Sequence, residues 1–171
     1  MSWALRCMRY CFFSYFSKPG PPRLPRPLKE RGRMAERRAF LWLKNMGIDV
    51  KRAGNRELHV RLTHNGRMEE FTLTGRADYL AENAVVEVKA GRPRTSYIPA
   101  YLAQLNLYML MYGIDQGLLL FGDGTFLRVR RSDFVIRQSL SYFSELAGCI
   151  EDFRVPEGDS AFCASCPYRV L

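Results

Sequence analysis

The sequence predicts an α/β fold in which a central mixed β-sheet is flanked by helices. Residues 84–90 form a β-branched run with the length of a buried strand. Residues 57–63 alternate apolar and polar side chains and lead into Asn65-Gly66, a pair typical of hairpin turns. Residues 99–112 are typical of a helix that opens with a proline and ends before a glycine. With 171 residues, 47% of them hydrophobic, we expect a single domain with its own core.

The charge of the chain is basic and uneven. Lysine and arginine together number 26 against 17 acidic residues, and residues 1–54 alone carry 13 basic and 3 acidic side chains. Clustered cations suit a polyanion such as nucleic acid, whereas a solvated surface or a partner with an acidic face is the alternative. The longest uncharged run near the start, residues 10–17, is too short to span a bilayer. We therefore expect a cytoplasmic protein without a membrane partner.

Residues 18–32 interleave five prolines with basic side chains. This composition predicts an extended arm that could follow a phosphate backbone, or else a mobile linker. A helix is expected over residues 33–46, and Glu36 falls on its apolar stripe. Glu36 is either a further acidic group for a metal site or an ion-pair partner of a nearby Arg37, Arg38 or Lys44. The arginines expected to bind nucleic acid lie in the arm and in a basic loop after residue 90: Arg23, Arg26, Arg31, Arg92 and Arg94.

Two opposite charges occur in the strand expected at residues 84–90. Side chains alternate across a strand, so Glu87 and Lys89 share one face. Such charges are costly to bury in an apolar strand unless they are paired or coordinate an ion. Asp78 comes near the end of the preceding expected strand, residues 68–80, where Gly75 indicates a bulge or a close approach of another chain. We therefore expect Asp78 to lie beside Glu87.

This pair of carboxylates suits hydrolysis of a nucleic-acid backbone. Oxygen ligands hold Mg²⁺ or Mn²⁺, which contacts the scissile phosphate and makes a water more acidic. Lys89 would stabilise negative charge or orient the attacking water. Further along, Gln104 and Tyr108 share a helical face. They could hydrogen-bond the phosphate and stack on a base, or Tyr108 could be a core tyrosine whose hydroxyl is satisfied.

The chain has five cysteines, and they lie mostly near its ends. An odd number without an export signal argues against a disulfide scaffold. Cys7 and Cys11 near one end, with Cys163 and Cys166 near the other, could supply four thiolates to an iron–sulfur cluster or zinc. Cys149 is expected to be a small buried apolar residue.

Four spaced motifs carry a family resemblance: Gly32-x-x-x-Glu36, Gly75-x-x-Asp78, Glu87-x-Lys89 and Gln104-x-x-x-Tyr108. With cysteines at both ends, the chain resembles the RecB-type nucleases of the PD-(D/E)xK superfamily, most of all the small CRISPR-associated RecB-like exonucleases. The resemblance covers nearly the whole chain and implies a restriction-endonuclease-like core. It implies these roles: metal ligation by Asp78, Glu87 and the Val88 carbonyl, support of the metal by Glu36, catalysis by Lys89, and positioning of the DNA strand by Gln104 and Tyr108.

The resemblance also implies a 4Fe–4S cluster held by one N-terminal cysteine and three near the C-terminus. Cys11 stands at the N-terminal position, and Cys163 and Cys166 stand at the first two of the trio. No third cysteine follows them. Either Cys7 substitutes, or the cluster is altered or absent, or the chain is truncated.

The function implied is a Mg²⁺- or Mn²⁺-dependent deoxyribonuclease, an exonuclease that prefers single-stranded DNA and also nicks. In the CRISPR family such an enzyme serves antiviral defence by trimming captured fragments before the integrase complex inserts them. A nuclease of viral or cellular recombination and repair would use the same chemistry. The sequence also leaves open a non-catalytic nucleic-acid-binding module and a structural cluster protein that docks a partner.

Overall fold

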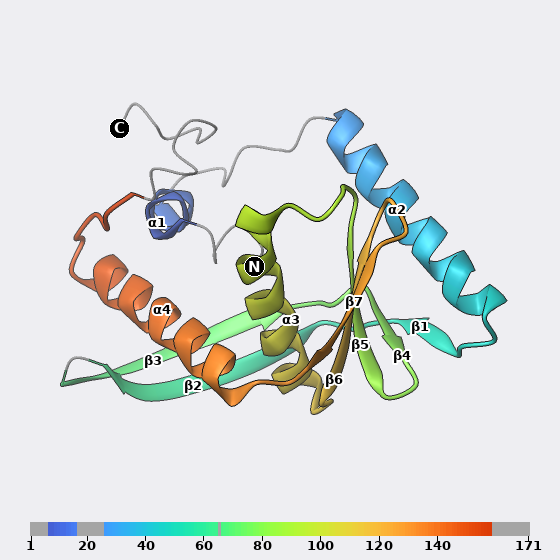
Figure 1. The fold of residues 1–171 in the computed structure, drawn as a ribbon. Helices are drawn as coiled ribbons and strands as arrows, with labels where there is room; N and C mark the ends of the chain where they lie inside the picture. The colour runs from blue at the N-terminus through green and yellow to red at the C-terminus, as the bar shows by residue number, and fades with distance from the viewer. Residues whose placement is uncertain (1–6, 17–25, 65, 159–171) are drawn as a thin grey trace.

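A computed structural model describes residues 7–16, 26–64 and 66–158, and Figure 1 shows their arrangement. The central sheet has five strands in the order β1–β4–β5–β6–β7. Strands β5 and β6 are parallel, and the other neighbours are antiparallel. The expected mixed sheet flanked by helices is therefore confirmed. The strands are β1 (Val50–Arg52), β4 (Tyr79–Ala81), β5 (Ala84–Lys89), β6 (Gln116–Phe121) and β7 (Phe126–Arg130).

A second sheet is a hairpin of two strands, β2 (Arg56–His64) and β3 (Arg67–Gly75). Gly66 in its turn has a φ of 77°, which favours glycine. The single strand expected over residues 68–80 is wrong, because β3 ends at Gly75 and the chain then crosses to the central sheet. Asp78 lies in this crossing, directly before β4.

Two helices cover opposite faces of the central sheet. On one face, α2 (Arg26–Asn45) buries Leu43 against Val86 of β5. On the other face, α3 (Ile98–Tyr112) buries Leu105 against Val85. Adjacent valines therefore point to opposite faces, as the strand pattern predicts. A short 3₁₀ turn, η1 (Thr95–Tyr97), precedes α3.

Helix α4 (Asp133–Glu151) packs between the hairpin and α1 (Met8–Phe16), as Figure 1 shows. Their shared core includes Phe12, Leu107, Phe143 and Cys149. Cys149 is fully buried, so the expectation of a small apolar core residue is confirmed. Among the described residues, no helix combines the length and the apolarity that crossing a bilayer requires.

Helix α2 begins earlier than expected, at Arg26, so residues 26–32 are helical and the expectation of an extended arm there is wrong. Pro27 is compatible with this start, because the backbone N–H that proline lacks would have no intrahelical partner in the first turn. Arg26 is paired with Glu30, one turn further on, at 3.0 Å. The preceding part of the expected arm, which includes Arg23, lies outside the described residues.

Candidate active site

Asp78 lies opposite Glu87 at one end of the central sheet. Strands β4 and β5 pair Tyr79 with Val86, and the same register continued by one residue sets Asp78 against Glu87. The Asp78 Oδ2 atom accepts a hydrogen bond from the Val88 backbone N–H at 2.7 Å. This hydrogen bond to the backbone of β5 fixes the Asp78 carboxylate beside that strand.

A chain of hydrogen bonds joins the side chains of β5 and α3. Lys89 Nζ donates to Glu87 Oε1 at 2.7 Å and to Gln104 Oε1 at 2.8 Å. Gln104 Nε2 in turn donates to the Tyr108 hydroxyl at 3.1 Å. The Lys89 and Glu87 side chains are only 12% and 7% exposed, so this is a buried ion pair and the ammonium is held in one place.

One oxygen of Glu87 has no partner in the part of the chain that the structure describes. Its Oε2 atom is buried and accepts no hydrogen bond. An unsatisfied buried carboxylate oxygen carries a desolvation cost, about 1–3 kcal/mol or more for a charged group. A cation placed between Glu87 and Asp78 would remove that cost, so the residues present fit a metal ion.

The pKa values of the two carboxyl groups reflect the same arrangement. Burial, and then the charge of Glu87, raises the pKa of Asp78 from 3.8 to about 7. The Val88 N–H and Lys89 oppose that rise. Burial also raises the pKa of Glu87, although Lys89 acts to lower it. Nearby positive charge reverses such shifts, and a bound divalent cation would be the largest local charge.

Glu36 lies beside this pair rather than within it. Its side chain is 30% exposed and pairs with Arg52 of β1 at 3.5 Å, not with the arginines or the lysine of its own helix considered from the sequence. Its negative charge contributes to the raised pKa of both Asp78 and Glu87. The sequence could not show the Arg52 contact, because β1 was not expected.

The described residues contain no group of three or more His, Cys, Asp or Glu side chains placed to hold one metal. The donor set at this site is thus two carboxylates with the nearby main chain. That set suits Mg²⁺ better than a zinc site, because Mg²⁺ is usually bound by one or two carboxylates and retains several waters. The Val88 carbonyl expected from the resemblance belongs to the same strand.

Tyr108 is a core tyrosine. It is 4% exposed, its ring packs with Val85 and Leu105, and burial raises its pKa to about 12. Its ring is therefore covered and does not offer a surface for stacking on a base. Gln104 is also buried. These two residues help to hold Lys89 in position, because Gln104 hydrogen-bonds both the Tyr108 hydroxyl and the Lys89 ammonium.

Tyr101 is a site residue that the sequence reasoning missed. The Lys89 ammonium lies 4.6 Å from the centre of its ring, within the range of a cation–π contact. Tyr101 precedes Gln104 by three residues on α3, so helical spacing would have placed both on one face. The face that carries Gln104 and Tyr108 thus also carries Tyr101.

The four described arginines among those expected to bind nucleic acid are spread over a helix and a loop. Arg92 and Arg94 are exposed on the loop that follows Lys89, at the same end of the sheet as the carboxylates. Arg31 is exposed on α2, as is Arg26. Only the loop pair is thus adjacent in sequence to the site.

The N-terminal cysteines lie one helical turn apart. Cys7 is buried, and Cys11 is partly buried with a pKa raised to about 12, first by burial and then by Cys7. Cys7 and residues 156–158 line one hollow, so the chain that leads toward Cys163 passes Cys7. Cys163 and Cys166 themselves lie outside the described residues.

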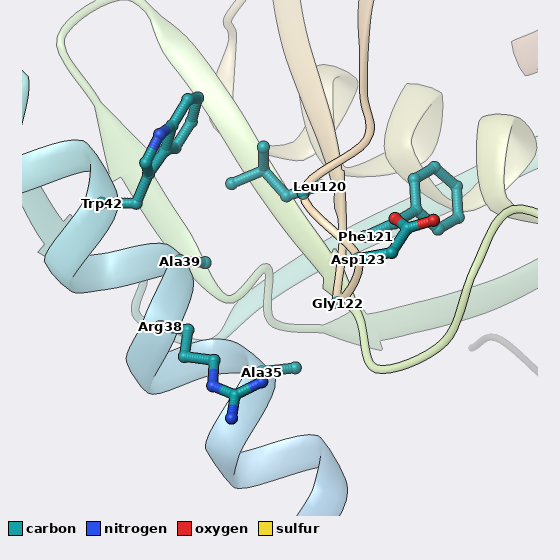
Figure 2. Close-up of a pocket in the computed structure, with 9 residues that line it drawn as sticks. Ala35, Arg38, Ala39, Trp42, Leu120, Phe121, Gly122 and Asp123 are labelled. Carbon is teal, nitrogen blue, oxygen red and sulfur yellow. The ribbon is translucent and has the colours of Figure 1, made fainter.

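A pocket of about 330 Å³ lies between α2 and the turn that joins β6 to β7 (Figure 2). Ala35, Ala39, Trp42 and Leu120 give it apolar walls, and the Asp123 side chain points away from α2. This pocket contains none of the side chains expected to carry catalysis.

The turn beside that pocket fixes the end of β5. The Gly122 N–H donates to the Lys89 carbonyl at 2.8 Å. A Cβ atom on Gly122 would lie 2.4 Å from the Ala90 carbonyl oxygen, so only glycine fits. The backbone that carries Lys89 is thereby held by β6 and the turn that follows it.

Solved structures share this fold. The crystal structure of SSO0001 matches 98% of this chain and 81% of its own, with a TM-score of 0.67 and 15% identity. The crystal structure of the exonuclease LHK-Exo in complex with dAMP matches 86% of this chain and 89% of its own, with a TM-score of 0.50 and 17% identity. No protein-family model and no curated protein matches the sequence. The fold is thus one that also occurs in a nuclease.

Proposed function

We propose that the protein is a nuclease that hydrolyses DNA phosphodiester bonds with Mg²⁺ or Mn²⁺ held by Asp78 and Glu87. The observation that carries this proposal is the buried Oε2 of Glu87, which has no hydrogen-bond partner among the described residues and lies next to Asp78. The Lys89 ammonium is fixed on the same side of the strand. The likeness of the fold to LHK-Exo, a nuclease bound to a nucleotide, supports it.

Asp78, Glu87 and the Val88 carbonyl would hold the ion. When bound, the metal would polarise the scissile phosphate and lower the pKa of a water. Asp78 must first release its proton, and a pKa of about 7 makes this release easy at neutral pH. The Val88 N–H binds Oδ2 of Asp78 and so fixes the carboxylate while Oδ1 is left for the ion.

Lys89 would contribute positive charge where negative charge develops. Glu87 and Gln104 accept two of the three hydrogens on its ammonium. The third is suited to an oxygen of the phosphate or of the attacking water, because the group is preorganised and partly shielded from solvent. Gln104 and Tyr108 would act by holding Lys89 in place, not by touching the substrate.

The finer activity that we propose is exonucleolytic cleavage of single-stranded DNA, with nicking. Trimming of captured fragments for a CRISPR integrase is the setting that the motif resemblance favours. Recombination or repair would use the same site. Addition of an integrase complex to the cleavage reaction would favour the first setting if it changed the length of the trimmed product.

We also propose that cysteines from both ends of the chain hold an iron–sulfur cluster, with Cys11 and Cys7 from the N-terminal end and Cys163 and Cys166 from the C-terminal segment. The shared hollow of Cys7 and residues 156–158 supports this. Burial raises the pKa of the Cys11 thiol, and iron would stabilise its thiolate form as a ligand. Protein purified anaerobically should be brown with a band near roughly 400 nm. Colourless, iron-free protein would remove the cluster.

Cleavage is tested with labelled single-stranded DNA and Mn²⁺. Wild-type protein and Lys51→Ala, which changes an exposed lysine on β1, should degrade the substrate. Lys89→Ala and samples with EDTA should not. If Lys89→Ala consumed the substrate as fast as wild type, the activity would come from a contaminant or from another site.

A further inference from the structure

A hollow of about 590 Å³ lies along α2 beside β1 and β4 and is rich in arginine. Its guanidinium groups come from three parts of the chain: α2, β1, and the crossing segment that precedes Asp78. We call it the arginine hollow. Its basic members are Arg33, Arg37, Arg52 and Arg76.

The arginine hollow has an excess of positive charge. Glu36 is the one acidic side chain among the described residues that line it, and Glu36 is paired with Arg52 at 3.5 Å. No ion pair joins the other three arginines to an acidic group among the residues that the structure describes. Arg33 and Arg37 lie four apart on α2, a spacing at which like charges destabilise a helix. A bound anion would offset that repulsion.

The arginine hollow adjoins the carboxylate site. Arg76 and Tyr79, which both line it, are close neighbours of Asp78 in the chain. The Glu36 carboxylate at its border acts on the pKa of both Asp78 and Glu87. If the scissile phosphate of a nucleic-acid strand lay at the carboxylates, the neighbouring phosphates of that strand would therefore lie in the arginine hollow.

The two aromatic residues that line the arginine hollow are Tyr79, which is buried, and Phe40, which is partly exposed. Tyr79 is 1% exposed, Phe40 packs against it, and the Arg52 guanidinium lies over its ring at 5.4 Å. The buried ring of Tyr79 therefore offers no face on which a base could stack, and that of Phe40 is only partly open. The accessible groups are guanidiniums, which bind phosphate oxygens in a bidentate manner and do so irrespective of base sequence.

We infer that the arginine hollow binds the phosphodiester backbone of the substrate strand next to the bond that is cut. This inference rests on the proposed nuclease function and names the surface that holds its substrate. None of these four arginines was among those expected from the sequence to bind nucleic acid. The ligand class is single-stranded nucleic acid, held by charge and without base preference.

The test measures binding rather than cleavage. A fluorescent oligonucleotide is titrated with protein in EDTA at several salt concentrations, using wild type, Arg37→Ala/Arg76→Ala, and Arg128→Ala/Arg137→Ala. The last variant removes the same charge from exposed positions on β7 and α4. Each lost phosphate contact on single strands should reduce the slope of log K against log salt by about 0.7. We therefore expect a reduction of about 1.4 for the first variant, equal for two unrelated oligonucleotide sequences.

The control variant should keep the wild-type slope, and neither variant should melt at a lower temperature than wild type. The inference is overturned if the arginine-hollow variant keeps the wild-type slope or if the control loses as much. It is also overturned if the arginine-hollow variant fails to bind polyglutamate while its DNA binding is unchanged, since the ligand would then be an acidic polypeptide. Because binding is measured without metal, an inactive enzyme would count against the proposed function alone.

Discussion

Replacing Asp78 with asparagine tests whether the carboxylate is held in an unfavourable charged state until metal arrives. Burial and the neighbouring Glu87 raise its pKa from 3.8 to about 7. Between these values the folded protein holds a proton that the unfolded chain has released. The stability of the metal-free protein should therefore decline as pH rises from about 4 to about 7.

The size of the effect follows from the shift. At 1.36 kcal/mol for each pKa unit, the ionised carboxylate costs the fold about 4 kcal/mol above neutral pH. Asparagine avoids that cost and still offers an oxygen to the Val88 N–H. For a chain of this size, each kcal/mol of stability shifts the melting temperature by about 2–4 °C. Asp78→Asn should therefore melt about 10 °C higher than wild type in EDTA at about pH 8.

Thermal melts at a series of pH values provide the measurement. The advantage of Asp78→Asn should shrink on acidification and vanish below about pH 4, where Asp78 is protonated in both states. Addition of Mn²⁺ at about pH 8 should raise the melting temperature of wild type more than that of the variant. Equal stability at every pH, or a variant less stable at high pH, would refute the assignment of a strained carboxylate.

Three further substitutions probe the neighbouring groups. Lys89→Met leaves Glu87 buried without its partner and should lower the free energy of unfolding in urea by about 3–5 kcal/mol. The double variant Lys89→Met/Glu87→Gln should regain most of that loss. No recovery would mean that the two side chains are not coupled. Gln104→Ala should lower kcat about 10–100-fold with little change in KM, because Lys89 loses one acceptor; a change confined to KM would instead indicate a contact with substrate. Gly122→Ala should lose about 2 kcal/mol of stability to overpacking, whereas Gly91→Ala, which has open space around its Cβ, should not; equal losses would contradict the close approach at the end of β5.

The elements best predicted from the sequence are those with local patterns. The β-branched run of β5 and the proline-to-glycine span of α3 set the two faces on which Glu87, Lys89 and Gln104 lie. Strand alternation and helical spacing suffice to gather these side chains, because both periods act within a few residues. Asp78 was expected beside Glu87 because the two residues belong to successive expected strands, and the β4–β5 register places them opposite each other.

The elements predicted poorly depend on contacts distant in sequence. The chain from residue 68 to residue 80 looks continuous, yet its two ends belong to different sheets, and no local pattern records which sheet a strand joins. The same reason hid β1 and with it the pairing of Arg52 with Glu36. The start of α2 was not predicted because of Pro27. Proline occurs both in the first turn of a helix and in an extended arm, so the sequence alone does not distinguish the two.

The central claim, that Asp78 and Glu87 share one divalent cation, is tested most directly by calorimetric titration of Mn²⁺ into the metal-free protein at about pH 8. We expect one site in wild type, and at least a roughly tenfold loss of affinity in both Asp78→Asn and Glu87→Gln. Wild-type affinity in either variant would contradict the claim, since the two carboxylates would then not be ligands of the same ion.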